Sequence, residues 1–340
     1  MELLTFNREQ LELVMDQIVR RTMDMDMTWG WPLGVACYGI SRAWEATKKE
    51  WYLDAVKERI DELIRLGLPV QTVNTCAMCH CLITLYEATR EESYLSQIHS
   101  MTEYLIHEAP RFGDHILQHT VSAANDFPEQ CWADTLFMAV YFLLRAGALE
   151  GREDLTKDAL NQYQQHIRYL QNPETGLWYH GYDNIGKNHM SGFHWGRANC
   201  WAAYTLSQAD RFLPEPYFHP EFMDIRGSLD ELLTALKKLQ TERGLWRTIL
   251  DDSDSYEEVS ASAGIAAAMA ARHNPLHAPY IQKALAGILG NVTAEGKVMN
   301  VSAGTAVMKD RDGYCRIPRT WIQGWGQGLT LAFLAQVLLY

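Results

Sequence analysis

Apolar side chains recur along this chain with the spacing of a single helix face. In segment 152–171, Leu155, Ala159 and Tyr163 fall on one side of a helix, which predicts an amphipathic helix. Segment 262–271 instead carries small apolar residues nearly all round, so a helix there must be buried on most sides. Helical spacing predicts about twelve helices, near 8–22, 32–48, 51–66, 74–88, 92–108, 131–147, 152–171, 195–209, 228–241, 257–271, 278–290 and 322–338.

Nearly all-apolar helices alternate with amphipathic ones along the chain. An inner ring of helices wrapped by an outer ring produces this alternation, so the sequence predicts an all-α fold, an (α/α)6 barrel. A weak repeat supports it, since segments 172–178, 241–246 and 293–298 each combine a turn with a short extended piece. The chain has no low-complexity linker or break in composition, and we expect one domain over residues 1–340.

Two kinds of segment predict where a functional site lies. Stretches rich in Trp and Gly stand at predicted helix starts, at 29–34, 195–199 and 321–328, and are expected to line one rim of the barrel. The irregular stretch 109–130 carries His115, His119 and Asp126, and long loops in compact domains tend to be functional.

Asp134, which follows that loop, is a carboxylate with aromatic neighbours on both sides. Burial beside Trp132 and Phe137 is expected to raise the pKa of Asp134, as a general acid near neutral pH requires. The alternative is an acid that merely occupies the first turn of a helix, where free backbone N–H groups favour it.

Charge and composition narrow the classes of partner. The 340 residues include 30 Lys plus Arg against 42 Asp plus Glu, and the net charge of −12 argues against nucleic acid or an anionic membrane as partner. The first ten residues have no secretion-signal pattern, and no run of 18 apolar residues occurs. The seven cysteines lie mostly within helical patterns, which suits reduced thiols, and we expect a cytoplasmic protein.

The run Cys76-Ala-Met-Cys79-His80 matches a haem-attachment pattern, with Cys81 as a further possible ligand. Haem attachment takes place after export, and no later Cys or His pair completes a zinc site. We therefore expect these residues to pack inside a helix, and we expect no metal site.

A second cluster of candidates lies in segments 176–183 and 192–201. Trp195 and Trp201 offer flat ring faces on which a sugar can stack, and Arg197 can grip a carboxylate through its planar fork. His180 can orient water or a hydroxyl group. Core packing of the tryptophans and an ordinary ion pair for Arg197 are the alternatives.

Three motifs, in order, carry a family resemblance: Trp132-Ala-Asp134-Thr-Leu-Phe-Met138, His180-Gly-Tyr-Asp183 and Trp195-Gly-Arg197-Ala-Asn199-Cys-Trp201. Over most of its length the chain resembles glycoside hydrolase family 105, the unsaturated rhamnogalacturonyl hydrolases. This resemblance implies the (α/α)6 barrel and a single principal acid, whereas ordinary glycosidases use two carboxylates.

The resemblance also implies roles for individual residues. Asp134 would protonate C4 of an unsaturated uronic acid and activate the water that adds at C5. Arg197 and His180 would position the sugar, with Trp195 and Trp201 as platforms. Two further binding residues are implied. Trp31 would belong to an aromatic wall of the site, and Asn74 stands where the family often has a second acidic residue. Asn can hydrogen-bond a sugar hydroxyl but cannot act as a carboxylate base.

The sequence thus predicts a cytoplasmic hydrolase, without metal or organic cofactor, that removes the unsaturated galacturonyl residue from rhamnogalacturonan fragments. An unsaturated glucuronyl hydrolase acting on glycosaminoglycan-type lyase products is the nearest alternative. A sugar 2-epimerase on the same barrel would need two catalytic histidines, from among His180, His194, His115 and His119. A sugar-binding barrel without catalysis is the last alternative, and the oligomeric state stays open.

Overall fold

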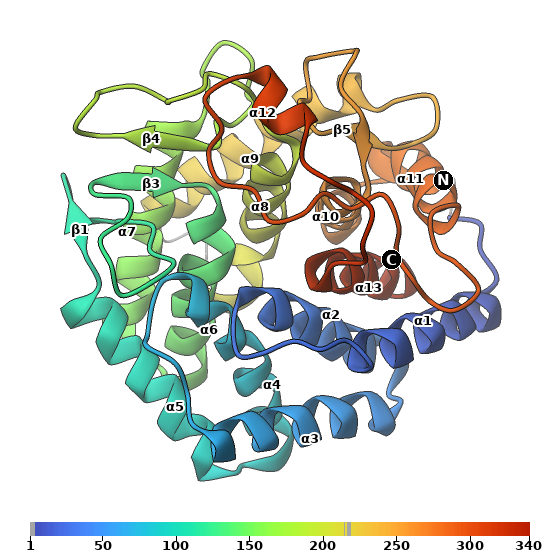
Figure 1. Cartoon of the computed structure of the whole chain (residues 1–340), viewed down its shortest axis with the longest axis horizontal. Helices are drawn as coiled ribbons and strands as arrows, with labels where there is room; N and C mark the ends of the chain where they lie inside the picture. The colour runs from blue at the N-terminus through green and yellow to red at the C-terminus, as the bar shows by residue number, and fades with distance from the viewer. Residues whose placement is uncertain (1–3, 214, 216–218) are drawn as a thin grey trace.

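Two concentric layers of helices surround one axis in the computed structural model, which describes residues 4–213, 215 and 219–340 (Figure 1). The predicted (α/α)6 barrel is confirmed. The outer helices are α1 (Arg8–Met23), α3 (Glu50–Leu66), α5 (Glu92–Glu103), α7 (Glu153–Leu170), α9 (Pro220–Leu239) and α11 (Ala278–Leu289). The inner helices are α2 (Trp31–Thr47), α4 (Cys79–Thr89), α6 (Tyr141–Glu150), α8 (Gly196–Gln208), α10 (Val259–Ala271) and α13 (Gly324–Leu339).

Short helical turns extend several of these helices or join them. Asn74–Met78 (η1) leads into α4, Tyr104–Glu108 (η2) continues α5, and Leu136–Val140 (η3) leads into α6. Ala209–Phe212 (η4) follows α8, and Pro275–His277 (η6) precedes α11. All twelve segments predicted from helical spacing contain a helix, with shifted boundaries where strands or turns intervene.

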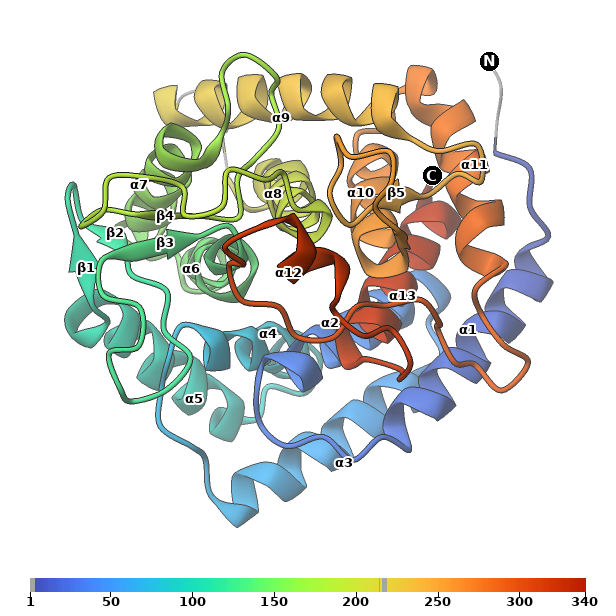
Figure 2. The same ribbon diagram turned by 45° about the horizontal axis from the view of Figure 1, so that its top comes forward.

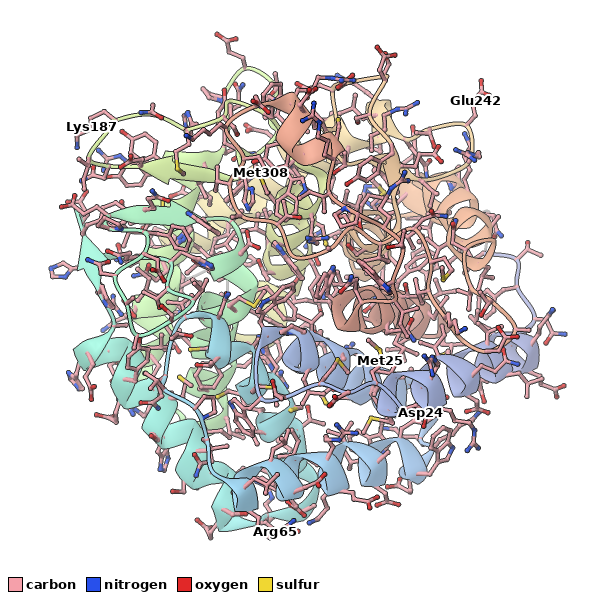
Figure 3. The ribbon with its side chains drawn as sticks, viewed as in Figure 1. Asp24, Met25, Arg65, Lys187, Glu242 and Met308 are labelled. Atoms are coloured by element: carbon pink, nitrogen blue, oxygen red, sulfur yellow. The ribbon has the colours of Figure 1, made fainter. Side chains whose placement is uncertain are left out.

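Side-chain size explains which helices are inside. Helix α10 consists almost wholly of Ala, Ser, Gly and other small or apolar residues and is buried on nearly all sides, whereas α7 buries one face only. The ring closes where α13 packs against α2. A Cβ atom added to Gly39 would lie 2.0 Å from the carbonyl oxygen of Gly328, so the close approach of these helices requires glycine. Side chains fill the space between the layers (Figure 3).

The repeated turn predicted from the sequence is present after α7, α9 and α11. Gly176, Gly244 and Gly296 each have positive φ, between 75° and 84°, which favours glycine. Each turn also lies against the next outer helix. A Cβ atom on Gly244 would approach the Lys283 oxygen to 2.1 Å, and one on Gly296 would approach the Gln17 oxygen to 2.1 Å.

Three small antiparallel sheets lie at one end of the barrel, which we call the mouth (Figure 1). They pair β1 (Arg111–Phe112) with β2 (Ile116–Leu117), β3 (Gln130–Trp132) with β4 (Gly181–Asp183), and β5 (Trp246–Arg247) with β6 (Glu257–Glu258). The helices predicted from residues 131 and 257 therefore begin later, because the first residues of both segments pair with another strand.

One segment crosses the mouth between the last two long helices. Residues 301–319, which we call the strap, include the short helix α12 (Arg311–Cys315) and pass over the centre of the ring (Figure 2). The sequence pattern did not predict this helix. Among the described residues, none of the helices combines the length and apolar character needed to span a lipid bilayer.

Candidate active site

A pocket of about 220 Å³ opens at the mouth and contains four of the predicted site residues: Asp134, Arg197, Trp31 and Asn74. Its remaining lining residues are His119, Val121, Phe127, Trp132, Met138, Gly304, Thr305 and Ala306. Larger hollows lie elsewhere, and the one between α1 and α11, about 490 Å³, is lined by no ionisable side chain. The pocket at the mouth therefore combines the volume of a small ligand with the candidate chemistry.

Pairing of β3 with β4 brings Asp134 and His180 together, although 45 residues of chain separate them. Trp132 lies opposite Gly181, and the Ala133 N–H donates to the His180 carbonyl at 2.9 Å. In consequence His180 Nε2 lies 3.2 Å from Asp134 Oδ2. The contact is oblique, and both atoms are buried without another hydrogen-bond partner. Buried polar atoms that lack a good partner are unusual, and here they adjoin a pocket.

The direction predicted for the pKa of Asp134 is wrong. Burial raises the pKa of Asp134, but the close contact with His180 and the charges of His180, His119 and Arg197 outweigh burial and lower it. The expectation took account of Trp132 and Phe137, which are adjacent in sequence. The histidines and the arginine come from other elements, so their effect was not visible in the local sequence.

His180 is enclosed on all sides. Its Nδ1 atom lies 2.9 Å from the Tyr314 hydroxyl oxygen, and its ring packs on the Trp195 ring at a centroid distance of 4.0 Å. Burial lowers the pKa of His180, and the nearby Asp134 carboxylate offsets part of that effect. The ring is therefore neutral at neutral pH, with one nitrogen as donor and the other as acceptor.

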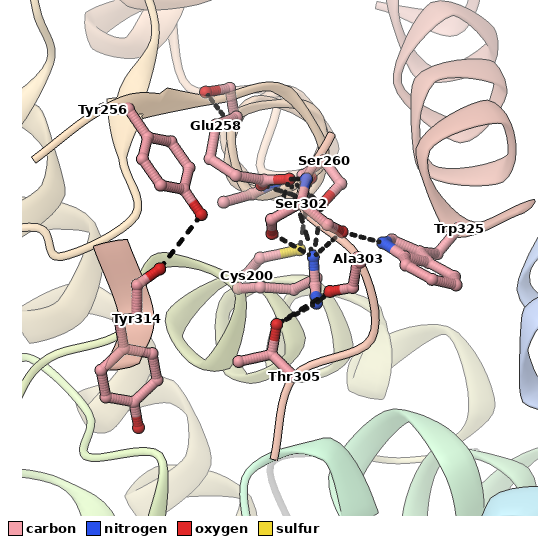
Figure 4. A network of polar contacts seen from close by, with 12 residues as sticks. Cys200, Tyr256, Glu258, Ser260, Ser302, Ala303, Thr305, Tyr314 and Trp325 are labelled. Atoms are coloured by element: carbon pink, nitrogen blue, oxygen red, sulfur yellow. Dashed lines mark hydrogen bonds and ion pairs between the residues drawn. The ribbon is translucent and has the colours of Figure 1, made fainter. Parts of the chain in front are cut away.

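Arg197, in the first turn of α8, holds the strap through Ser302, Ala303 and Thr305, which are labelled in Figure 4. One terminal nitrogen donates to the carbonyl and hydroxyl oxygens of Ser302, at 3.0 and 2.8 Å. The other donates to the Ala303 carbonyl at 2.9 Å and the Thr305 hydroxyl at 3.2 Å. Its planar fork is thus engaged within the protein. The predicted grip on a substrate carboxylate is corrected to a positive charge beside the pocket that also positions the strap.

Glu258 lies behind Arg197 and is fully engaged. It caps α10 by accepting from the Ala261 N–H at 2.6 Å, as expected for an acid at a helix start. It also accepts from the Ser260 hydroxyl and from the Ser302 N–H, at 2.8 Å each. One Glu258 oxygen lies 3.6 Å from Arg197 Nη1. Figure 4 shows Glu258, Ser260 and Ser302 within one network of polar contacts.

The predicted tryptophans differ in position, because Trp31 lines the pocket whereas Trp195 and Trp201 are buried in the core. Trp195 and Trp201 are 1% and 0% exposed, because Trp195 packs on His180 and Trp201 on Phe137. The prediction that they offer free platforms to a sugar is therefore wrong, and core packing is their role. Trp31 and Trp132 line the pocket instead. Trp31 stacks on Trp325 at 4.3 Å, and Trp132 stacks on His119 at 4.4 Å.

Asn74 lines the pocket, and the residue is half-buried. His119 is the histidine among the described lining residues, and burial lowers the pKa of His119 to about 4. His194 instead pairs with Asp251 at 2.7 Å, and His115 is exposed. Of the four histidines considered for an epimerase, His119 lines the pocket and His180 adjoins it through Asp134, whereas His194 and His115 are not among its lining residues.

The cysteine run near residue 76 packs in the core, as predicted. Cys76, Cys79 and His80 are buried, and the His80 Nε2 atom lies 2.8 Å from the Phe137 carbonyl oxygen. The described residues include no group of three or more His, Cys, Asp or Glu side chains placed to hold a metal. Lys187 lies at the outer edge of its loop, bonded to Asn184 at 2.7 Å (Figure 3).

Sequence reasoning missed two parts of the site. Val121 and Phe127 come from the loop that was expected to be functional, but nothing local indicated which of its residues face the pocket. Gly304, Thr305 and Tyr314 belong to the strap, whose sequence has no periodic pattern. Only the position of the strap over the mouth brings these residues to Asp134.

Comparison with known proteins gives a consistent result. The sequence profile described as Glycosyl Hydrolase Family 88 matches residues 6–340. The unsaturated rhamnogalacturonyl hydrolase YesR of Bacillus subtilis (strain 168) is 51% identical over 336 residues, which cover 98% of this chain and 97% of YesR. The resemblance found in the three sequence motifs is confirmed.

Solved structures of related proteins agree with the family assignment. A possible member of family GH105 from Salmonella enterica superposes with a TM-score of 0.94 at 28% identity, covering 98% of this chain and 95% of that one. The unsaturated glucuronyl hydrolase of Bacillus sp. GL1 superposes with a TM-score of 0.70 at 16% identity, covering 96% and 94%. The second likeness shows the shared fold alone.

Proposed function

Because this chain belongs to glycosyl hydrolase family 88, we propose that it removes the unsaturated galacturonyl residue from rhamnogalacturonan lyase products by hydrating the C4=C5 double bond. The protein is a glycoside hydrolase. The substrate follows YesR, which is named for this activity and matches nearly the whole chain.

The observation that carries the proposal is the single carboxylate of the pocket. Asp134 is the one acidic side chain among the described lining residues. Ordinary glycosidases need two carboxylates on opposite sides of the scissile bond. Glu258 cannot supply the second, since its oxygens accept from Ser260, the Ala261 N–H and the Ser302 N–H. Protonation of a double bond followed by addition of water needs one acid that later serves as base.

In the proposed reaction, protonated Asp134 gives its proton to C4 of the unsaturated uronate. Positive charge develops at C5 and the ring oxygen, and water adds at C5 while the Asp134 carboxylate takes a proton from it. The hemiketal so formed opens and releases the remaining saccharide. Asp134 ends each cycle in the protonation state in which it began.

The lowered pKa of Asp134 is compatible with this cycle. The substrate carries its own carboxylate, and a like charge nearby raises a carboxyl pKa. Binding of the substrate therefore favours the protonated form of Asp134. His180 and Arg197 then stabilise the carboxylate that remains after the proton has moved to C4.

Helix starts make the mouth attractive to an anion, although the protein has a net charge of −12. The free N–H groups of a helix N-terminus carry partial positive charge. Residues in or next to the first turns of the inner helices, or of the short helical turns that lead into them, surround the pocket or contact its lining: Trp31, Asn74, Asp134, Arg197, Glu258 and Trp325. Together with Arg197, they favour a uronate carboxylate.

Selectivity against glucuronyl substrates must depend on the linkage and the leaving saccharide. Galacturonate and glucuronate differ in configuration at C4, and formation of the C4=C5 double bond removes that difference. Val121, 41% exposed, and Phe127 line the outer part of the pocket and offer an apolar surface. Such a surface suits rhamnose, whose C6 is a methyl group, better than a sulfated amino sugar.

Ultraviolet absorbance of the conjugated double bond tests the substrate and the chemistry together. We expect it to fall with unsaturated galacturonyl-rhamnose and to persist with an unsaturated chondroitin disaccharide. In D2O the product should carry one deuterium at C4. Loss with the chondroitin disaccharide alone would overturn the substrate, and no loss with either would overturn the hydration reaction.

We also propose a cytoplasmic location. All seven cysteines are free thiols, and six of them are buried, which fits a reducing compartment. Cell fractionation of the native organism with an antibody against the protein tests this, and recovery with secreted proteins would contradict it.

A further inference from the structure

We propose that Tyr314 is a positioning residue that holds His180 in the tautomer whose Nε2 hydrogen faces Asp134. The inference rests on the proposed function, because it assigns Tyr314 to the acid that performs the reaction. Tyr314 lies in α12 of the strap, 134 residues from His180 in sequence.

Two contacts define the arrangement. The Tyr314 hydroxyl oxygen lies 2.9 Å from His180 Nδ1, and the opposite ring nitrogen, Nε2, lies 3.2 Å from Asp134 Oδ2. All three side chains are buried or nearly so, and Tyr314 is 0% exposed. The imidazole therefore bridges a phenol and a carboxylate, and each ring nitrogen faces one of them.

The direction of the hydrogen bond follows from the protonation of each group. Burial raises the pKa of Tyr314 to about 12, so its hydroxyl keeps its hydrogen. Its other polar neighbour, the Ser191 hydroxyl, is farther away, at 3.4 Å. A neutral phenol can donate or accept, and the Asp134 carboxylate 3.2 Å from Nε2 favours a hydrogen on that nitrogen, which leaves Nδ1 to accept from the Tyr314 hydroxyl. Since His180 is neutral, its ring hydrogen then resides on Nε2, the nitrogen that lies 3.2 Å from Asp134 Oδ2 in an oblique contact.

This tautomer matters for a residue that must act as acid and then as base. A hydrogen on Nε2 stabilises the carboxylate left after Asp134 protonates C4. With the hydrogen on Nδ1, a lone pair on Nε2 would face the carboxylate and destabilise it. Tyr314 thus acts on the reaction through His180 and has no contact with Asp134 of its own in the structure.

The strap keeps the Tyr314 ring in place. The Tyr256 hydroxyl donates to the Tyr314 carbonyl at 3.3 Å, as Figure 4 shows, and Arg311 forms an ion pair with Asp252. Arg197 binds the other end of the strap at Ser302. Two of the pocket's walls, the strap and the β3–β4 pair, are therefore connected by the hydrogen bond from Tyr314 to His180.

Replacement of Tyr314 by Phe tests the inference, since Phe fills nearly the same volume and removes only the hydroxyl. We expect kcat to fall roughly tenfold, as loss of a well-placed hydrogen bond predicts. The pH at which kcat declines on the basic side should rise by roughly half a unit to one unit, because the Asp134 carboxylate is less stabilised in the complex with substrate. The other ionisable groups that influence Asp134 and His180, namely His119 and Arg197 with Glu258 behind it, are the same in both proteins.

Tyr256→Phe is the matched control. It also removes one hydroxyl that contacts Tyr314, but at the backbone carbonyl and not at His180. The inference requires that the pH profile shift in Tyr314→Phe and stay in place in Tyr256→Phe. Equal shifts in both variants, or no shift in Tyr314→Phe, would overturn it, since a merely structural role predicts those results.

Nitrogen-15 NMR of the histidine rings shows, without substrate, which ring nitrogen of His180 carries the hydrogen. The His180 resonances, assigned by comparison with His180→Gln, should report the Nε2–H tautomer in the wild-type protein and a loss of that preference in Tyr314→Phe. A wild-type Nδ1–H tautomer would contradict the inference. If the wild-type protein consumed neither disaccharide, the proposed function would fail, while this spectrum would still decide the role of Tyr314.

Discussion

Two of the polar clusters inside the barrel differ in their surroundings and in how the side chains at their centre are paired. At the mouth, Asp134 Oδ2 and His180 Nε2 face each other obliquely and have no other partner. Farther along the inner helices, the Tyr38 hydroxyl lies 3.2 Å from that of Tyr141 and 2.8 Å from that of Tyr204. The first cluster adjoins a pocket and the second is buried in the core.

The cluster around Tyr38, Tyr141 and Tyr204, which we call the axial cluster, also contains Arg145. This arginine donates to the His80 carbonyl at 2.9 Å and lies over the Tyr38 ring, and its Nε atom is buried without a hydrogen-bond partner. Burial lowers the pKa of His80 to about 3, a larger shift than that of His119 beside the pocket. Perturbed ionisation alone therefore does not distinguish a functional site from a structural network. Incomplete pairing next to a pocket does, because a substrate can complete it.

The largest expected effect comes from Asp134→Asn, which preserves shape and removes the proton. Turnover should fall by at least roughly a hundredfold while the disaccharide still binds. Activity measured by absorbance and binding measured by calorimetry check this. Asp126→Asn, an exposed acid of the preceding loop, is the control and should retain activity. Near-normal turnover in Asp134→Asn would remove the mouth cluster from the reaction.

A pair of arginine variants sharpens the comparison. Arg197→Lys removes the planar fork that binds Ser302, Ala303 and Thr305, so kcat/KM should fall roughly tenfold or more. Arg145→Lys disturbs the axial cluster and should lower the thermal midpoint with little change in kcat/KM for the molecules that remain folded. Steady-state kinetics and calorimetry on both proteins separate the effects. A loss of kcat/KM in Arg145→Lys alone would contradict the assignment of catalysis to the cluster at the mouth and of stability to the axial cluster.

The smallest effect, a modest loss of stability with unchanged turnover, is expected from Tyr38→Phe. The variant removes a hydroxyl that contacts Tyr141 and Tyr204, and the free energy of unfolding should fall by about 1 kcal/mol. Urea denaturation measures the change, and kcat should equal that of the wild-type protein. A drop in kcat without a drop in stability would show that the axial cluster contributes to the reaction.

The helices were predictable because burial of an inner helix requires apolar residues on every side. Helix α10 and helix α7 show the two patterns clearly, the first apolar all round and the second amphipathic. The turns at Gly176, Gly244 and Gly296 were predictable for a similar reason, since each needs glycine at a fixed place. Short strands such as β3 were not, because three residues carry too little periodicity.

The sequence identified candidate site residues by the chemistry of their side chains, but it did not determine the role that each one takes. Asp134 and His180 were found from their motifs, and the structure brings them into contact. For Trp195, Trp201 and Arg197 the functional alternative was chosen, and the structure shows packing for the tryptophans and strap binding for the arginine. A large ring or a guanidinium serves equally well in either role, so only its neighbours decide.

By itself, the sequence determined the alternation of apolar and amphipathic helices, the glycine turns between them and the presence of an acid within the motif at residues 132–138. These depend on spacing and side-chain chemistry, which are local. The tertiary structure alone decided that the strap crosses the mouth, that Tyr314 meets His180, and that the pKa of Asp134 is lowered. Each of these results from groups far apart in sequence, and an electrostatic field or a hydrogen bond depends on distance in space.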